Sequence, residues 1–71
     1  MIEKGKKVHV KLTSSQCEKL GIQGFAEGIN QTGTVDNHYT NGIDGYYIQL
    51  HGSKRIAVAA SYNAVTEIKE E

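Results

Sequence analysis

Residues 44–60 read Asp-Gly-Tyr-Tyr-Ile-Gln-Leu-His-Gly-Ser-Lys-Arg-Ile-Ala-Val-Ala-Ala, and this stretch determines the fold. Tyr46, Ile48 and Leu50 alternate with Tyr47, Gln49 and His51, which is the period of two that a half-buried strand requires. Gly52-Ser53 fits a two-residue turn whose first position accepts positive φ. The return strand then carries Ile56, Val58 and Ala60. The stretch therefore predicts a β-hairpin.

Upstream of the hairpin, the chain predicts a strand followed by a short helix. Lys7–Leu12 has an apolar residue at every second position, as expected for a strand with one face buried. Ser14 or Ser15 can cap a helix, and Ser15, followed three residues later by Glu18, fits a capping box. Gly21 suits the left-handed residue that ends a helix. We expect a helix over Ser15–Leu20, with Cys17 on its buried face.

The remaining segments predict short strands joined by turns. Ile22–Gln31 predicts a folded loop whose Phe25 plugs the barrel, and Gly33–Asn37 predicts a second strand. Asn41-Gly42 and Asp44-Gly45 are turn dipeptides. Ser61–Ala64 predicts a turn with 3₁₀ geometry, and Val65–Ile68 predicts the last strand.

This order of elements predicts a mainly β fold, a five-stranded SH3-like small barrel with one short helix between strands 1 and 2. A closed or nearly closed barrel leaves few exposed strand edges. With 71 residues, the chain has room for one domain and one small core. We expect a single SH3-like domain over residues 1–71, with flexible ends at 1–6 and 69–71.

Composition indicates a soluble cytoplasmic protein. The chain has one cysteine and a formal net charge of zero, so it forms no internal disulfide and carries no basic excess of the kind that nucleic-acid modules show. Its longest apolar run, Ile56–Ala60, is far too short to span a membrane. We expect a monomer without membrane contact.

The closing segment, Ala60-Ser-Tyr-Asn-Ala-Val-Thr-Glu-Ile68, resembles the end of SH3 domains. Asn63, Val65 and Ile68 stand where that pattern places an Asn in the 3₁₀ turn and two apolar residues after it. Ala64 replaces the ligand-stacking tyrosine, the Ala-Leu-Tyr-Asp-Tyr signature is missing, and the chain has no Trp. The resemblance thus implies the scaffold but not the proline-rich ligand.

In length and element order, the whole chain resembles the YorP family of small prophage-associated proteins of unknown function. Those proteins have five strands with a helix between two of them. The resemblance implies a phage-derived cytoplasmic protein and contributes no site residues.

The chain contains no pattern that predicts catalysis or a cofactor. His9, His38 and His51 lack metal-ligand spacing, and Asx turns explain the Asp and Asn residues between positions 36 and 44. Cys17 falls at an apolar position of the helix, which favours a small buried hydrophobe over a nucleophile. His9 and His51 both fall on outward positions of their strands, so they could approach each other across the barrel surface. We expect no enzyme, no metal and no cofactor.

Aromatic residues give the first candidate binding surface. Tyr39 in a loop and Tyr62 in the 3₁₀ turn are expected to flank one groove, with Phe25 or Gln23 from the loop before strand 2. Tyr47 lies on the outer phase of its strand. Tyrosine is enriched at protein interfaces. We therefore expect a non-enzymatic adaptor or inhibitor that binds a protein partner. The alternative to a binding role for Tyr62 is that its ring packs on Val65.

Basic residues give the alternative. If Lys7, Lys11, Lys54 and Arg55 share a face with Tyr47, they would form a basic patch with an aromatic platform. Small barrels bind single-stranded nucleic acid in this way. The neutral total charge and nearby glutamates weigh against this alternative.

Overall fold

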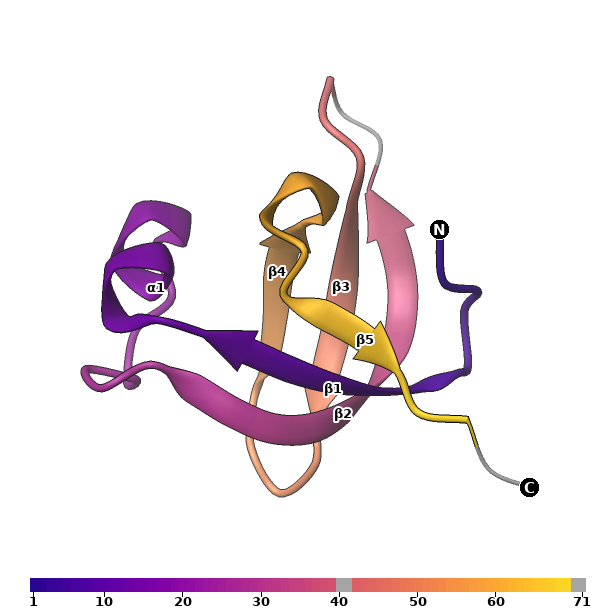
Figure 1. The fold of residues 1–71 in the computed structure, drawn as a ribbon, viewed down its shortest axis with the longest axis horizontal. Helices are drawn as coiled ribbons and strands as arrows, with labels where there is room; N and C mark the ends of the chain where they lie inside the picture. Colours follow the sequence, from indigo (N-terminus) through magenta and orange to yellow (C-terminus); the bar gives the residue numbers. More distant parts are fainter. Residues whose placement is uncertain (40–41, 70–71) are drawn as a thin grey trace.

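The computed structural model describes residues 1–39 and 42–69 and contains five strands and one α-helix (Figure 1). In chain order the elements are β1 (Lys7–Leu12), α1 (Ser14–Leu20), β2 (Ile29–Tyr39), β3 (Gly45–Leu50), β4 (Arg55–Ala59), the 3₁₀ turn η1 (Ala60–Tyr62) and β5 (Val65–Glu67). The strands form one antiparallel sheet in the order β4-β3-β2-β1-β5. The predicted mainly β fold, with a short helix between strands 1 and 2, is confirmed. Asn41 of the predicted Asn41-Gly42 turn, and Glu70 and Glu71 of the predicted flexible end, lie outside the described residues.

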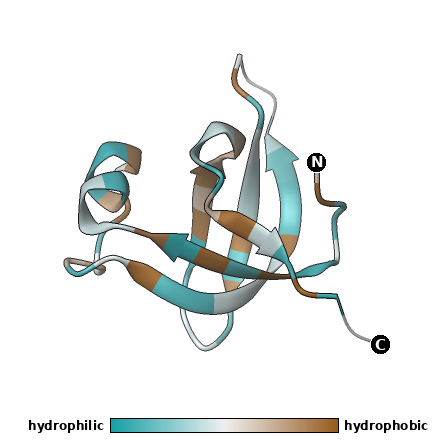
Figure 2. Ribbon diagram, in the orientation of Figure 1, coloured by the Kyte–Doolittle hydropathy of each residue, from teal (hydrophilic) through white to brown (hydrophobic). Residues whose placement is uncertain are grey.

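The sheet curls around one core, and the alternation seen in the sequence decides which side chains fill it (Figure 2). Apolar and polar residues alternate along β1, β3 and β4, so each strand turns one row of side chains inward. Val8, Val10, Ile48, Leu50 and Val58 have no exposed surface. Tyr46 and Ile56 are also buried, as the hairpin stretch predicts. Within the described residues, no helix is long and apolar enough to cross a membrane.

Strand β2 is longer than predicted and bends in its middle (Figure 1). It begins at Ile29, which pairs with Leu12 of β1, although Asn30 and Gln31 read as loop residues in the sequence. A bulge lies between Val35, which pairs with Ile48, and Asn37, which pairs with Tyr47. The extra residue is Asp36. Bulges of this kind bend a strand and re-aim its side chains, and here β2 pairs with β1 on one side and β3 on the other.

Helix α1 begins earlier than predicted, because its N-cap is Thr13 rather than Ser14 or Ser15. The Gln16 N–H donates to the Thr13 hydroxyl at 3.2 Å, and the Thr13 N–H donates to the Gln16 side-chain carbonyl at 2.9 Å. These two bonds form a complete capping box. Gly21 ends the helix in the left-handed conformation (φ 73°), as predicted, and Cys17 is buried, as predicted.

The β3–β4 connection differs from the predicted two-residue turn. Leu50 N–H donates to the Lys54 carbonyl at 3.2 Å, so the loop contains three residues, and Gly52 is its central one with φ 73°. The 3₁₀ turn spans Ala60–Tyr62 and ends at Asn63, which adopts φ 54°. Asparagine tolerates this left-handed region better than most residues.

The first six residues, expected to be loosely ordered, hydrogen-bond to β2 and β3. Gly5 N–H donates to the Val35 carbonyl at 2.8 Å, and Val35 N–H donates to the Lys6 carbonyl at 3.0 Å. Ile2 N–H donates to the Tyr46 hydroxyl at 3.0 Å, and His38 Nε2 lies 2.6 Å from the Ile2 carbonyl. The segment thus covers the end of the core above Tyr46.

Candidate binding surface

Three tyrosines from three elements converge at one end of the sheet: Tyr39 from β2, Tyr47 from β3 and Tyr62 from η1. We call them the tyrosine cluster. The rings of Tyr39 and Tyr47 meet edge to face, with centroids 5.2 Å apart and an interplanar angle of 61°. Partial burial raises the pKa of Tyr39, and the nearby phenol groups of Tyr47 and Tyr62 raise it further. Tyr39 and Tyr47 are therefore in ring contact, and Tyr62 lies near enough for its phenol to raise the pKa of Tyr39.

Gly45 creates the space in which the Tyr39 ring lies. Tyr39 pairs with Gly45 across β2 and β3. A Cβ at position 45 would clash with the Tyr39 ring atoms Cζ, Cε1 and Oη. The ring of Tyr39 thus lies directly against the backbone of β3 at Gly45. This contact requires a bulge that turns Tyr39 outward and a glycine that lets its ring approach.

Arg55 of β4 borders the cluster. Its guanidinium carbon lies 4.4 Å from the centroid of the Tyr47 ring, within cation–π range. Its Nε lies 2.6 Å from Oδ2 of Asp36, the bulged residue of β2. Both side chains are about half exposed, at 48% and 47%, so the pair adds little stability. Its effect is to hold the guanidinium over the tyrosine ring.

Phe25 does not belong to this surface, which corrects the predicted groove. It is half-buried against the core, and it lines a pocket beside α1 with Cys17 and Ile22. Lys54 Nζ lies 5.5 Å from the Phe25 ring centroid and donates to the Gln23 carbonyl. Lys54 precedes β4 and Tyr62 follows it. The five residues of β4 rise about 3.3 Å each, so these ends are about 16 Å apart. Phe25 was also predicted to plug the barrel, and it does pack against the core.

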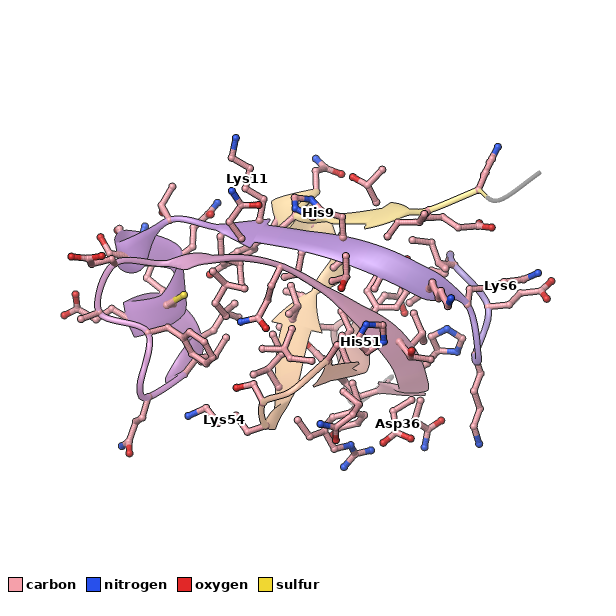
Figure 3. The ribbon with its side chains drawn as sticks, turned by 90° about the horizontal axis from the view of Figure 1, so that it is seen from below. Lys6, His9, Lys11, Asp36, His51 and Lys54 are labelled. Atoms are coloured by element: carbon pink, nitrogen blue, oxygen red, sulfur yellow. The ribbon has the colours of Figure 1, made fainter. Side chains whose placement is uncertain are left out.

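The predicted basic patch is divided. Lys11 of β1 and Lys54 lie on opposite sides of the molecule, with β1 and β2 between them (Figure 3). Lys7 and Lys11 are exposed residues of β1, whereas Arg55 stacks on Tyr47 and pairs with Asp36. The four basic residues therefore do not form one continuous surface with Tyr47.

His9 and His51 lie on the same outer face of the sheet, as their strand phases predicted (Figure 3). His9 Nε2 lies 2.6 Å from the Asn30 side-chain oxygen. The two ring nitrogens of His51 lie 3.1 and 2.9 Å from the hydroxyls of Thr32 and Thr34. Among residues 1–39 and 42–69, no group of three His, Cys, Asp or Glu residues could hold a metal ion.

Sequence reasoning missed Asp36, Arg55 and Gly45 as parts of the tyrosine surface. The period of two gave a signal for Arg55, because it places Arg55 and Tyr47 on the same outward phase of paired strands. The role of Asp36 depends on the bulge, and the role of Gly45 depends on the register. No family model, curated protein or solved structure matches this chain.

Proposed function

We propose that this protein is a non-enzymatic binding module that holds a protein partner through the tyrosine cluster. The convergence of Tyr39, Tyr47 and Tyr62 from three separate elements is the observation that carries the proposal. Tyrosine rings bring large contact area at low entropic cost and a hydroxyl at the wet edge, which suits protein contacts. Arg55, held over Tyr47, adds a second residue type that interface centres favour.

We further propose that the barrel is SH3-like and that the protein works as a phage-derived monomer in the cytoplasm. The long connection between β1 and β2, the tight β3–β4 hairpin and the 3₁₀ turn before β5 support the scaffold. The origin and the compartment rest on the resemblance to the YorP family and on the composition.

Affinity capture with matched variants tests the proposal. Wild type and the double variant Tyr39→Ala, Tyr62→Ala are immobilised at equal density and exposed to host lysate with and without nuclease. Thr66→Ala, an exposed β5 residue that pairs with His9, is the control. We expect a protein captured by wild type and by the control, in both nuclease arms, and lost from the double variant. A correctly folded double variant that captures the same protein at full level would refute the proposal.

Nucleic-acid binding is the second candidate function, favoured only by the exposed lysines of β1. It predicts retention on single-stranded DNA or RNA that weakens steeply with salt. Lys7→Gln, Lys11→Gln would then reduce retention, and capture of any protein partner would disappear after nuclease treatment. The absence of binding to either nucleic acid at low salt removes this candidate.

A further inference from the structure

Among residues 1–39 and 42–69, no strand pairs with the outer edge of β4. In the strand order β4-β3-β2-β1-β5, β4 stands at one end of the sheet and is paired only with β3. Helix α1 and the residues after it lie beside this edge in Figure 1. An unpaired edge presents a row of backbone donors and acceptors whose natural partner is another extended chain.

The hydrogen bonds at the two ends of the β3–β4 pair identify which residues face this edge. Leu50 N–H donates to the Lys54 carbonyl, and Ala60 N–H donates to the Asp44 carbonyl. In an antiparallel pair, residues alternate between those bonded to the partner strand and those whose N–H and C=O point away. Ile56 and Val58 therefore bond β3. By the same alternation, the backbone N–H and C=O groups of Arg55, Ala57 and Ala59 point to the open edge.

A shallow pocket of about 330 Å³ runs along the first half of this edge. Ile22 and Leu20 line it on the α1 side, and Ile56 and Ala57 line it on the β4 side. Of the described residues that line it, Lys54 and Arg55 are charged and none carries a carboxylate. The pocket thus combines apolar walls with positive charge beside an extended backbone.

We propose that the β4 edge binds an extended segment of the partner protein as an added strand. This inference rests on the proposed protein-binding function and names its mode. The segment bonds through the N–H and C=O of Ala57, and it carries an apolar side chain for the Ile22 wall and an acidic side chain near Lys54. Main-chain hydrogen bonds supply affinity in this kind of recognition, and the alternate side chains supply specificity.

Ala57→Pro is the variant that tests the mode. Proline removes the Ala57 N–H, which points to the open edge, and leaves the β3–β4 hydrogen bonds intact, because edge strands accept proline there. Ala57→Ser keeps the N–H and is the matched control. The probe is a twelve-residue random peptide library displayed on phage and selected on wild type, followed by synthesis of the enriched peptide. We expect enriched peptides with an acidic and an apolar residue, bound about tenfold more weakly by Ala57→Pro and normally by Ala57→Ser.

Amide hydrogen exchange of wild type keeps the test decisive if Ala57→Pro does not fold. The free protein is expected to exchange the Ala57 amide faster than those of Ile56 and Val58, and the peptide is expected to slow the Ala57 amide selectively. Unchanged exchange at Ala57 with bound peptide overturns the inference, as does a library that yields no binder. Protection of Ala57 that rises with protein concentration alone also overturns it, because the occupant is then a second copy.

The same peptide separates this inference from the proposed function. If Tyr39→Ala, Tyr62→Ala abolishes binding while Ala57→Pro does not, the tyrosine cluster binds and the edge inference fails. If Ala57→Pro abolishes binding while the double variant binds normally, the edge is the binding site and the tyrosine proposal fails.

Discussion

Lys54 and Arg55 are neighbours in the chain, and each lies over an aromatic ring, but the two rings belong to different parts of the molecule. Lys54 lies over Phe25, which packs against the core beside α1. Arg55 lies over Tyr47, on the outer face of the sheet next to Asp36. The period of two of a strand sends adjacent side chains to opposite faces. The comparison teaches that two neighbouring basic residues at the start of a strand can contact aromatic rings in different parts of the molecule.

Substitution on the inner face of β4 is expected to cause the largest loss of stability. Val58 has no exposed surface and lies on β4 between the two aromatic sites. We expect Val58→Ala to cost about 2 to 3 kcal/mol, from lost burial and the cavity left behind. Urea unfolding measures the cost. A melting temperature equal to that of wild type would show that the inward phase of β4 is wrong.

Removal of Phe25 is expected to cost less than the loss at Val58, because its ring is only half-buried. Phe25→Ala should destabilise the fold by about 1.5 kcal/mol, measured by thermal unfolding. Tyr47→Ala, the matched change at the other site, should cost about 0.5 to 1 kcal/mol, since Tyr47 contributes a cross-strand contact rather than core packing. Equal costs at the two positions would break the distinction between a core site and a surface site.

Loss of the Asp36–Arg55 ion pair is expected to change stability only slightly. The two side chains are about half exposed, so Asp36→Asn should cost less than about 0.5 kcal/mol, and the difference should fade with added salt. Urea unfolding at low and high salt measures it. A loss above about 1.5 kcal/mol would mean that the pair supports the bulge of β2 itself.

The smallest expected effect concerns the pKa of Tyr39, which burial raises first and the phenols of Tyr47 and Tyr62 raise further. Tyr62→Phe should lower this pKa while leaving most of the shift, and NMR titration of the Tyr39 ring measures it. Because the folded-state pKa lies above the unfolded value of about 10, the neutral phenol stabilises the fold below that pH. The stabilisation is lost as pH rises through the folded-state pKa. An unchanged Tyr39 pKa in Tyr62→Phe would place Tyr62 outside the cluster.

Much of the fold follows from residues whose local pattern and tertiary environment agree. β1 and the inner positions of β3 were predictable because the apolar residues that alternate along the sequence are the ones that fill the core. The N-cap of α1 was not predictable, because Thr13 with Gln16 fits a capping box as well as Ser15 with Glu18 does. The first residues of β2 were also missed, since Asn30 and Gln31 become strand only by pairing with β1.

The tyrosine surface was predictable in part. Tyr47 reads as outward from its strand phase, and Tyr39 with Tyr62 was expected to flank one groove. Phe25 was misplaced because the path of the loop after α1 depends on tertiary contacts, such as the Lys54 bond to the Gln23 carbonyl. Whether the tyrosines meet depends on the register of β2 against β3, which no local pattern specifies.

The bulge at Asp36 sets the phase of the β2 residues that follow it. Before the bulge, Val35 faces inward, and after it Asn37 and Tyr39 share the outward phase of Tyr47 and Gly45. In an unbulged strand, position 39 would fall on the inward phase, and His38 would turn outward in its place. Deletion of Asp36 would instead join Val35 directly to Asn37 and leave Asn37, His38 and Tyr39 opposite Tyr47, Tyr46 and Gly45, so the tyrosine surface would keep its phase. For this barrel, the bulge is what allows β2 to carry one extra residue and still present Tyr39 opposite Gly45.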